Sequence, residues 1–241
     1  MLLNRIAQGF RAQNWLTVFV ELLVLIVGIF LGLQVDDWNQ RRLDRIEEQY
    51  YLDRLERDLE RSLIEQNSAM ETARVKFEAA LSILRMLESG NPATMTDAQF
   101  AELLGRLSGF PRLALVTATM DEIVANGKAS LLQSRVLREE LAAFVEWYED
   151  EERYYDSLSG TIVDGYRRRY HYARPEWPDL DRLPRWSANR ETLVNDADAI
   201  SWMRQMTAAF SRLWRDLQDL NRETNEIYNV LKNEAGRQNR E

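Results

Sequence analysis

Residues 15 to 35 read WLTVFVELLVLIVGIFLGLQV, and this stretch decides the fold. Fifteen of its 21 residues are Leu, Ile, Val or Phe. As a helix rising about 1.5 Å per residue, the stretch spans about 31 Å, the thickness of the hydrocarbon core of a bilayer. Transfer of its apolar side chains into lipid gains several kcal/mol, which outweighs the roughly 3 kcal/mol cost of burying Glu21. The sequence therefore predicts a transmembrane helix over 15–35, preceded by a tail over 1–14.

The residues on either side of this stretch suit the two membrane surfaces. Indole and guanidinium groups favour the headgroup region, so we expect four membrane-interface anchors: Trp15, Trp38, Arg41 and Arg42. No small-x-small cleavage site follows the apolar run, which argues against a cleaved signal peptide. The flanking arginines do not decide the orientation. A short tail before a first anchor favours a cytoplasmic N-terminus, with the remainder of the chain in the periplasm of a bacterium.

One face of the predicted transmembrane helix is not lipid-like. On a wheel of about 100° per residue, Gly28 and Gly32 lie within about 20° of Glu21, and Thr17 lies within about 40°. The glycines form a G-x-x-x-G pattern that allows helices to approach closely, and an intramembrane carboxyl group needs a partner or a proton. The stripe predicts a helix–helix interface, either with a second copy or with another membrane subunit. The alternative is a protonated Glu21 beside incidental glycines.

Residues 36–241 have the pattern of a helical bundle outside the bilayer. The whole chain has only ten Gly and five Pro, which favours long helices. Apolar residues recur every three or four positions over 39–88, 134–169 and 189–235, the last at heptad spacing. Residues 96–133 are expected to form short elements that cap one end. The predicted fold class is all-α: one N-terminal transmembrane helix continuing into an antiparallel bundle of long coiled-coil-like helices.

Two details of the bundle carry further expectations. Asn221 and Thr224 occupy seam positions of the last helix, where a buried polar residue can set register or oligomeric state; the alternative is an exposed turn. In an antiparallel arrangement the first long helix leads away from the bilayer and the helix over 134–169 returns towards it.

The only long irregular stretch, residues 170–188, would then lie at the membrane end. Together with the three residues before it, this stretch forms a basic and aromatic cluster that suits anionic headgroups or a protein partner. The cluster comprises Arg167, Arg168, Arg169, Tyr170, Tyr172, Trp177 and Trp186. The alternative is a loop that closes the core.

Catalytic patterns are missing from the sequence. The chain has no Cys and one His, His171, which excludes a catalytic triad and a zinc site built on histidines. The chain carries a net charge of -8 and residues 1–35 carry +1, so the remainder carries -9. An acidic domain is a poor nucleic-acid binder. We expect no enzyme activity, no cofactor, no metal and no nucleic-acid partner.

Several segments resemble a family of uncharacterised bacterial single-pass membrane proteins. These are QNW at 13–15 with the acidic Glu21, VGIFLGLQVDDWN at 27–39, and YYLDRLERDL at 50–59, with a weaker match in MDEIVANGK at 120–128. Where members of that family often have Asn or Ser, this chain has Asp36 and Asp37. The resemblance implies a bacterial inner-membrane location, and it supplies neither a function nor catalytic residues.

Three functions are compatible with these patterns. The first is a non-enzymatic accessory subunit whose anchor packs on other transmembrane subunits of a respiratory, photosynthetic or transport complex, while its bundle braces their soluble portions. The second is an extracytoplasmic sensor bundle that binds a small ligand between helices and signals through a partner. The third is a homo-oligomeric coiled-coil spacer.

Overall fold

The computed structural model describes residues 15–177 and 185–238, and it confirms the all-α prediction. Most of the described residues are helical, because the chain supplies long runs without Gly or Pro between its breaks. The elements are α2 (Trp15–Ser89), η1 (Pro92–Thr94), α3 (Asp97–Arg106), α4 (Ala118–Ala125), η2 (Lys128–Leu131), α5 (Arg135–Tyr172), β1 (Arg174–Glu176), β2 (Arg185–Ser187), α6 (Arg190–Leu193) and α7 (Ala197–Gln238).

The chain divides into two compact units, Met1–Tyr50 and Tyr51–Glu241. The first unit contains the described part of α2 up to residue 50, and the predicted tail over 1–14 lies outside the described residues. The second unit contains the rest of α2 and all later elements. The apolar stretch and the first bundle helix therefore belong to one unbroken helix.

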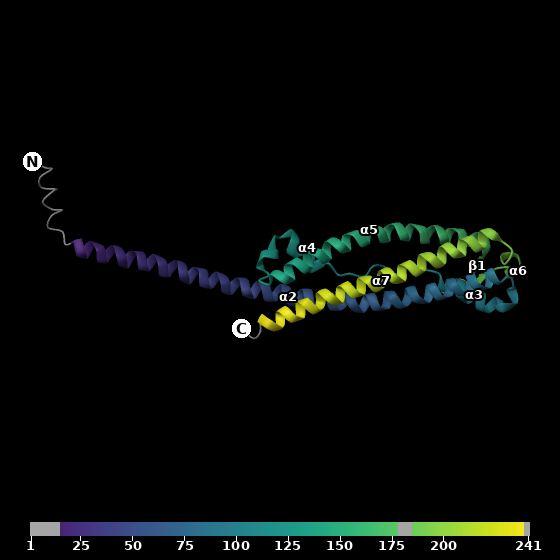
Figure 1. Ribbon diagram of the computed structural model, residues 1–241, viewed down its shortest axis with the longest axis horizontal. Coiled ribbons are helices and arrows are strands. Elements are labelled where there is room, and N and C mark those ends of the chain that lie inside the picture. The colour runs from purple at the N-terminus through teal and green to yellow at the C-terminus, as the bar shows by residue number, and fades with distance from the viewer. Residues whose placement is uncertain (1–14, 178–184, 239–241) are drawn as a thin grey trace, which may run out of the picture. The chain divides into compact units, whose positions relative to one another are not determined.

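The second unit is built on three long helices: α2 from residue 51, α5 and α7 (Figure 1). Helix α7 is antiparallel to α2, since Lys232 near its end pairs with Glu56 and Arg204 near its beginning pairs with Glu88. These surface pairs contribute little energy by themselves, but they mark the register.

Helices α5 and α7 are also antiparallel. The indole of Trp202 donates to the carbonyl oxygen of Gly165 over 2.9 Å, and further along the pair the guanidinium of Arg212 lies 4.9 Å from the ring centre of Tyr154. Helix α5 therefore runs in the same direction as α2. The expectation that the helix over 134–169 returns along the first is wrong.

An extended segment explains this direction. Residues 107–117, which we call the strap, connect α3 at the Ser89 end of α2 to α4 at its Tyr51 end. The strap runs antiparallel to α2 along its side, so the chain has already returned when α5 begins. The expectation that residues 96–133 form a cap at one end is therefore wrong.

Polar side chains of α2 hold the strap. Lys76 donates to the carbonyl oxygens of Arg106 and Ser108, Gln66 donates to that of Ala114, and Ser62 accepts the N–H of Val116 at 2.9 Å. The strap pairs with no described strand, so its buried backbone N–H and C=O groups need hydrogen bonds from side chains. This need accounts for the buried Ser62, Gln66 and Lys76 in an otherwise apolar face.

The core follows the predicted helical periodicity. It comprises two clusters, a larger one centred on α2, α3, α5 and α7 and a smaller one near Tyr51, α4 and the beginning of α5. Residues of the predicted heptad seam of α7 are buried, including Met203, Phe210, Leu217 and Leu231. The face that periodicity identified is the face that packs.

The polar seam residues of α7 face α2. Thr224 Oγ1 accepts from Gln66 Nε2 at 3.0 Å, and Asn221 Nδ2 donates to Gln66 Oε1 at 3.3 Å. These two hydrogen bonds join helices of the same chain, so they fix the register of α7 on α2.

Several local expectations are refined. Helix α5 continues through Gly160 and Gly165 to Tyr172. The final helix is preceded by the separate short α6. Thr96 and Gln99 form a capping box at the beginning of α3, and Thr119, inside α4, donates to Asp58 of α2. The predicted irregular stretch contains the antiparallel pair β1 and β2.

Candidate functional site

The apolar stretch of α2 is exposed along its whole described length. Side chains from Val18 to Val35 contact no core, and α2 is the one described helix long and apolar enough to cross a membrane. Such a surface is costly in water and favourable in lipid. The backbone of Trp15 and Thr17 belongs to α2, but their side chains lie outside the described part of the chain.

The Glu21, Gly28 and Gly32 face lies open on this helix. A Cβ atom built on either glycine has no described atom within 4 Å, and Glu21 is exposed. Beyond the stretch, Trp38, Arg41 and Arg42 are exposed too. Whether these residues anchor the helix or contact a partner stays a prediction.

The basic and aromatic cluster divides into inward and outward members. Arg169 and Trp186 are buried, and the guanidinium of Arg169 lies 3.7 Å from the ring centre of Trp186. Tyr172 is half-buried and stacks on Trp202. These contacts fix the hairpin of β1 and β2 on the ends of α5 and α7, so Arg169 and Trp186 close the core at this point.

The outward members are exposed side chains of α5 and the segment after it. Arg167 pairs with Asp164, Arg168 donates weakly to Gln205, and Tyr170 and Trp177 are exposed. The hairpin packs on α3, at the end of the second unit that contains Ser89. It does not lie at the end where the chain enters from the apolar stretch. A lipid-binding or partner-binding role for the outward residues stays a prediction.

Two buried cations stabilise the end of α3. Arg169 donates to the carbonyl oxygen of Leu104 and to Ser108 Oγ, and Lys76 donates to the carbonyl oxygens of Arg106 and Ser108. Positive charge suits the unsatisfied carbonyls of a helix C-terminus. Burial lowers the pKa of Lys76 to about 8, and the nearby charge of Arg169 adds to this effect. These cations are structural parts of the strap.

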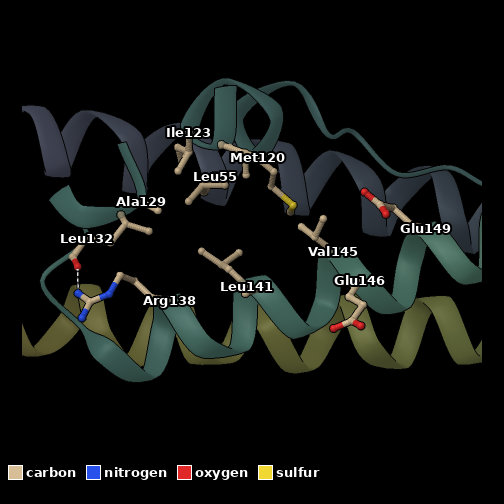
Figure 2. Close-up of a pocket in the computed structure, with 12 residues that line it drawn as sticks. Leu55, Met120, Ile123, Ala129, Leu132, Arg138, Leu141, Val145, Glu146 and Glu149 are labelled. Atoms are coloured by element: carbon tan, nitrogen blue, oxygen red, sulfur yellow. Dashed lines mark hydrogen bonds between the residues drawn. The ribbon is translucent and has the colours of Figure 1, made fainter. Parts of the chain in front are cut away.

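A mostly apolar cavity of about 290 Å³ lies between α2, α4, η2 and the first half of α5. Figure 2 shows the aliphatic side chains directed into the cavity, with Arg138 at one end of the row and Glu149 at the other. Its lining includes Leu55, Met120, Ile123, Ala129, Leu132, Leu141 and Val145.

A second hollow, of about 410 Å³, continues from this cavity along α5. Met120, Val145 and Glu149 line both spaces. The second hollow is polar, because Asp121, Tyr148 and Glu152 add to its lining. An apolar chamber thus adjoins an acidic one.

Sequence reasoning did not identify these hollows. Their walls include α4 and η2, which lie beside the beginning of α5 because the strap runs back along α2. No short-range sequence pattern predicts the path of the strap. The apolar residues Met120, Ile123 and Leu132 are a partial signal in the sequence, because several apolar residues in a short segment indicate that the segment is buried.

Within the described residues, no group of three or more His, Asp or Glu side chains is arranged to hold a metal ion. No family model, no curated protein and no solved structure matches this chain.

Proposed function

We propose that this chain is a membrane-anchored, non-enzymatic accessory subunit that stabilises a larger membrane protein complex. The observation that carries the proposal is the Glu21, Gly28 and Gly32 face, which is open on an apolar helix. A carboxyl group and two glycines in lipid are explained most simply by a neighbouring helix that packs on them. We place the chain in a bacterial inner membrane with its bundle in the periplasm.

The construction of the second unit supports a bracing role. Helix α2 is unbroken between the apolar stretch and the bundle, and α7 and the strap are fixed on it by buried polar contacts. Such a unit can hold partner subunits in place without chemistry of its own. The host assembly would be a respiratory, photosynthetic or transport complex.

Affinity purification of the full chain from native membranes in mild detergent, followed by mass spectrometry, tests the proposal. We expect a defined set of membrane subunits with the unmodified chain, and loss of that set with Gly32→Leu. Phe30→Leu is the matched control, because residue 30 lies about 180° from Glu21 on the helix wheel.

Recovery of a monomer alone would contradict the proposal. Recovery of a differently tagged second copy, with no other subunit, would favour the homo-oligomeric spacer instead.

A further inference from the structure

The two joined hollows on α5 combine features that the accessory role does not need. The apolar cavity of about 290 Å³ is close to the lower limit of small-molecule sites, which run from about 300 to 1,000 Å³. An apolar wall with a few polar groups at one end is the usual construction of such sites. The groups at the polar end decide which ligand chemistry fits.

Charge is distributed unevenly along the hollows. At one end Arg138 donates to the carbonyl oxygens of Leu132 and Gln133, so its guanidinium closes the cavity on the η2 side (Figure 2). At the other end Glu149 and Glu152 project from successive turns of α5. A ligand with an apolar body would therefore be oriented with any positive group away from Arg138.

The carboxylates at the acidic end are not neutralised. Among residues 15–177 and 185–238, no cation pairs with Glu149 or Glu152, and Asp121 accepts only from the hydroxyl of Thr117 at 2.8 Å. Elsewhere on α5, Glu139 pairs with Arg135 and Asp150 pairs with Arg153. Negative charge is thus concentrated at the mouth of an apolar cavity.

Tyr148 supplies an independent observation. Its side chain lines the acidic hollow and is only 9% exposed, and its hydroxyl group keeps some solvent contact and has no hydrogen-bond partner among the described residues. The hydroxyl group is therefore available to a ligand in the hollow. Burial, reinforced by the charges of Glu152 and Asp121, raises the pKa of Tyr148 to about 12. The neutral phenol therefore offers both an oxygen acceptor and an aromatic ring to a cation.

We propose that these joined hollows bind a small organic cation, a primary or quaternary amine with a hydrocarbon body of about six carbons. The hydrocarbon body lies between Leu55, Ile123 and Leu141. The ammonium group lies beside Tyr148, with Glu149 and Glu152 around it. This site is independent of the membrane-helix face and goes beyond the proposed function.

Isothermal titration of the full chain in phosphatidylcholine nanodiscs tests the site, with empty nanodiscs as the blank for partition into lipid. The probe is hexylamine at about pH 7, and hexanol and hexanoate are matched neutral and anionic probes. We expect saturable binding of hexylamine at one site, weaker binding of hexanol and none of hexanoate. Charge selection of this kind follows from unpaired carboxylates at the mouth of an apolar cavity.

The decisive variant is the double substitution Glu149→Gln and Glu152→Gln, which removes two unpaired surface charges and leaves the core intact. We expect it to weaken hexylamine binding about tenfold and to leave hexanol binding unchanged. The control is Glu140→Gln with Asp156→Asn, which removes the same charge from α5 outside both hollows.

Three results would overturn the site: no saturable heat with hexylamine, equal binding of all three probes, or an equal loss in the control variant. The last would mean that only net charge matters.

Discussion

Replacement of Gln66 by methionine tests the packing of the strap on α2. Gln66 is fully buried; its amide group donates to the carbonyl oxygen of Ala114 and to Thr224 Oγ1, both at 3.0 Å. Methionine has a similar volume, so the substitution removes the hydrogen bonds without leaving a large cavity. The perturbation is therefore mainly polar.

The expected cost follows from the groups that lose a partner. A buried acceptor without a donor costs about 1–3 kcal/mol. The carbonyl oxygen of Ala114 loses its side-chain donor and the amide of Asn221 loses its acceptor, Gln66 Oε1, while Thr224 keeps the bond from its hydroxyl to the carbonyl oxygen of Leu220. We therefore expect Gln66→Met to lower the free energy of unfolding by about 2–4 kcal/mol, and the melting temperature by roughly 5–15 °C for a domain of this size.

Chemical denaturation of the full chain in detergent, followed by tryptophan fluorescence, measures the loss. Gln218→Met is the matched control, because the same exchange on the exposed face of α7 should cost less than about 0.5 kcal/mol. Trypsin cleavage at the exposed Arg112 of the strap should also become faster in Gln66→Met. Equal stability of the two variants would refute the polar attachment of the strap.

Three other substitutions test helices α5 and α7. Burial raises the pKa of Asp216 to about 6 from 3.8, so the folded state binds the proton more tightly, and this contribution is present at low pH and lost as the pH rises through 6. Between pH 7.5 and 4.5 the native chain should therefore gain about 2 kcal/mol over Asp216→Asn in denaturation experiments, and a constant difference would contradict this. Gly160→Ala should stabilise α5 by about 0.5–1 kcal/mol, since nothing lies near its Cβ position. Gly165→Ala should destabilise it by about 1–3 kcal/mol, because the new methyl overlaps the sulfur of Met206, and thermal melts that rank the two alanines in the other order would refute this packing.

The sequence predicted the helices well because their signals are local. A repeat of apolar residues every three or four positions specifies a buried helix face, and residues such as Phe210 and Leu217 lie where the repeat placed them. The end of the helix predicted over 39–88 is equally local, since α2 ends at Ser89 and Gly90 adopts a φ of 64° that glycine tolerates.

The direction of α5 and the position of the hollows depend on long-range packing. The strap has no period of its own, and its path is fixed by Ser62, Gln66 and Lys76, which lie at least thirty residues away in the sequence. These polar residues on the buried face of α2 were the one sign in the sequence that an extended segment, and not a helix, packs against that face. Arg169 was likewise placed among surface residues, because its cationic side chain gives no hint that Trp186 and the end of α3 will surround it.

Photocrosslinking within native membranes tests the central claim most directly. A benzophenone side chain at Leu25 lies about 40° from Glu21 on the helix wheel, and one at Phe30 lies on the opposite face. We expect Leu25 to form an adduct with a different membrane protein, identified by mass spectrometry, and Phe30 to label lipid only. Absence of protein adducts from Leu25, or equal labelling from both positions, would contradict a membrane helix that packs on a partner through its Glu21, Gly28 and Gly32 face.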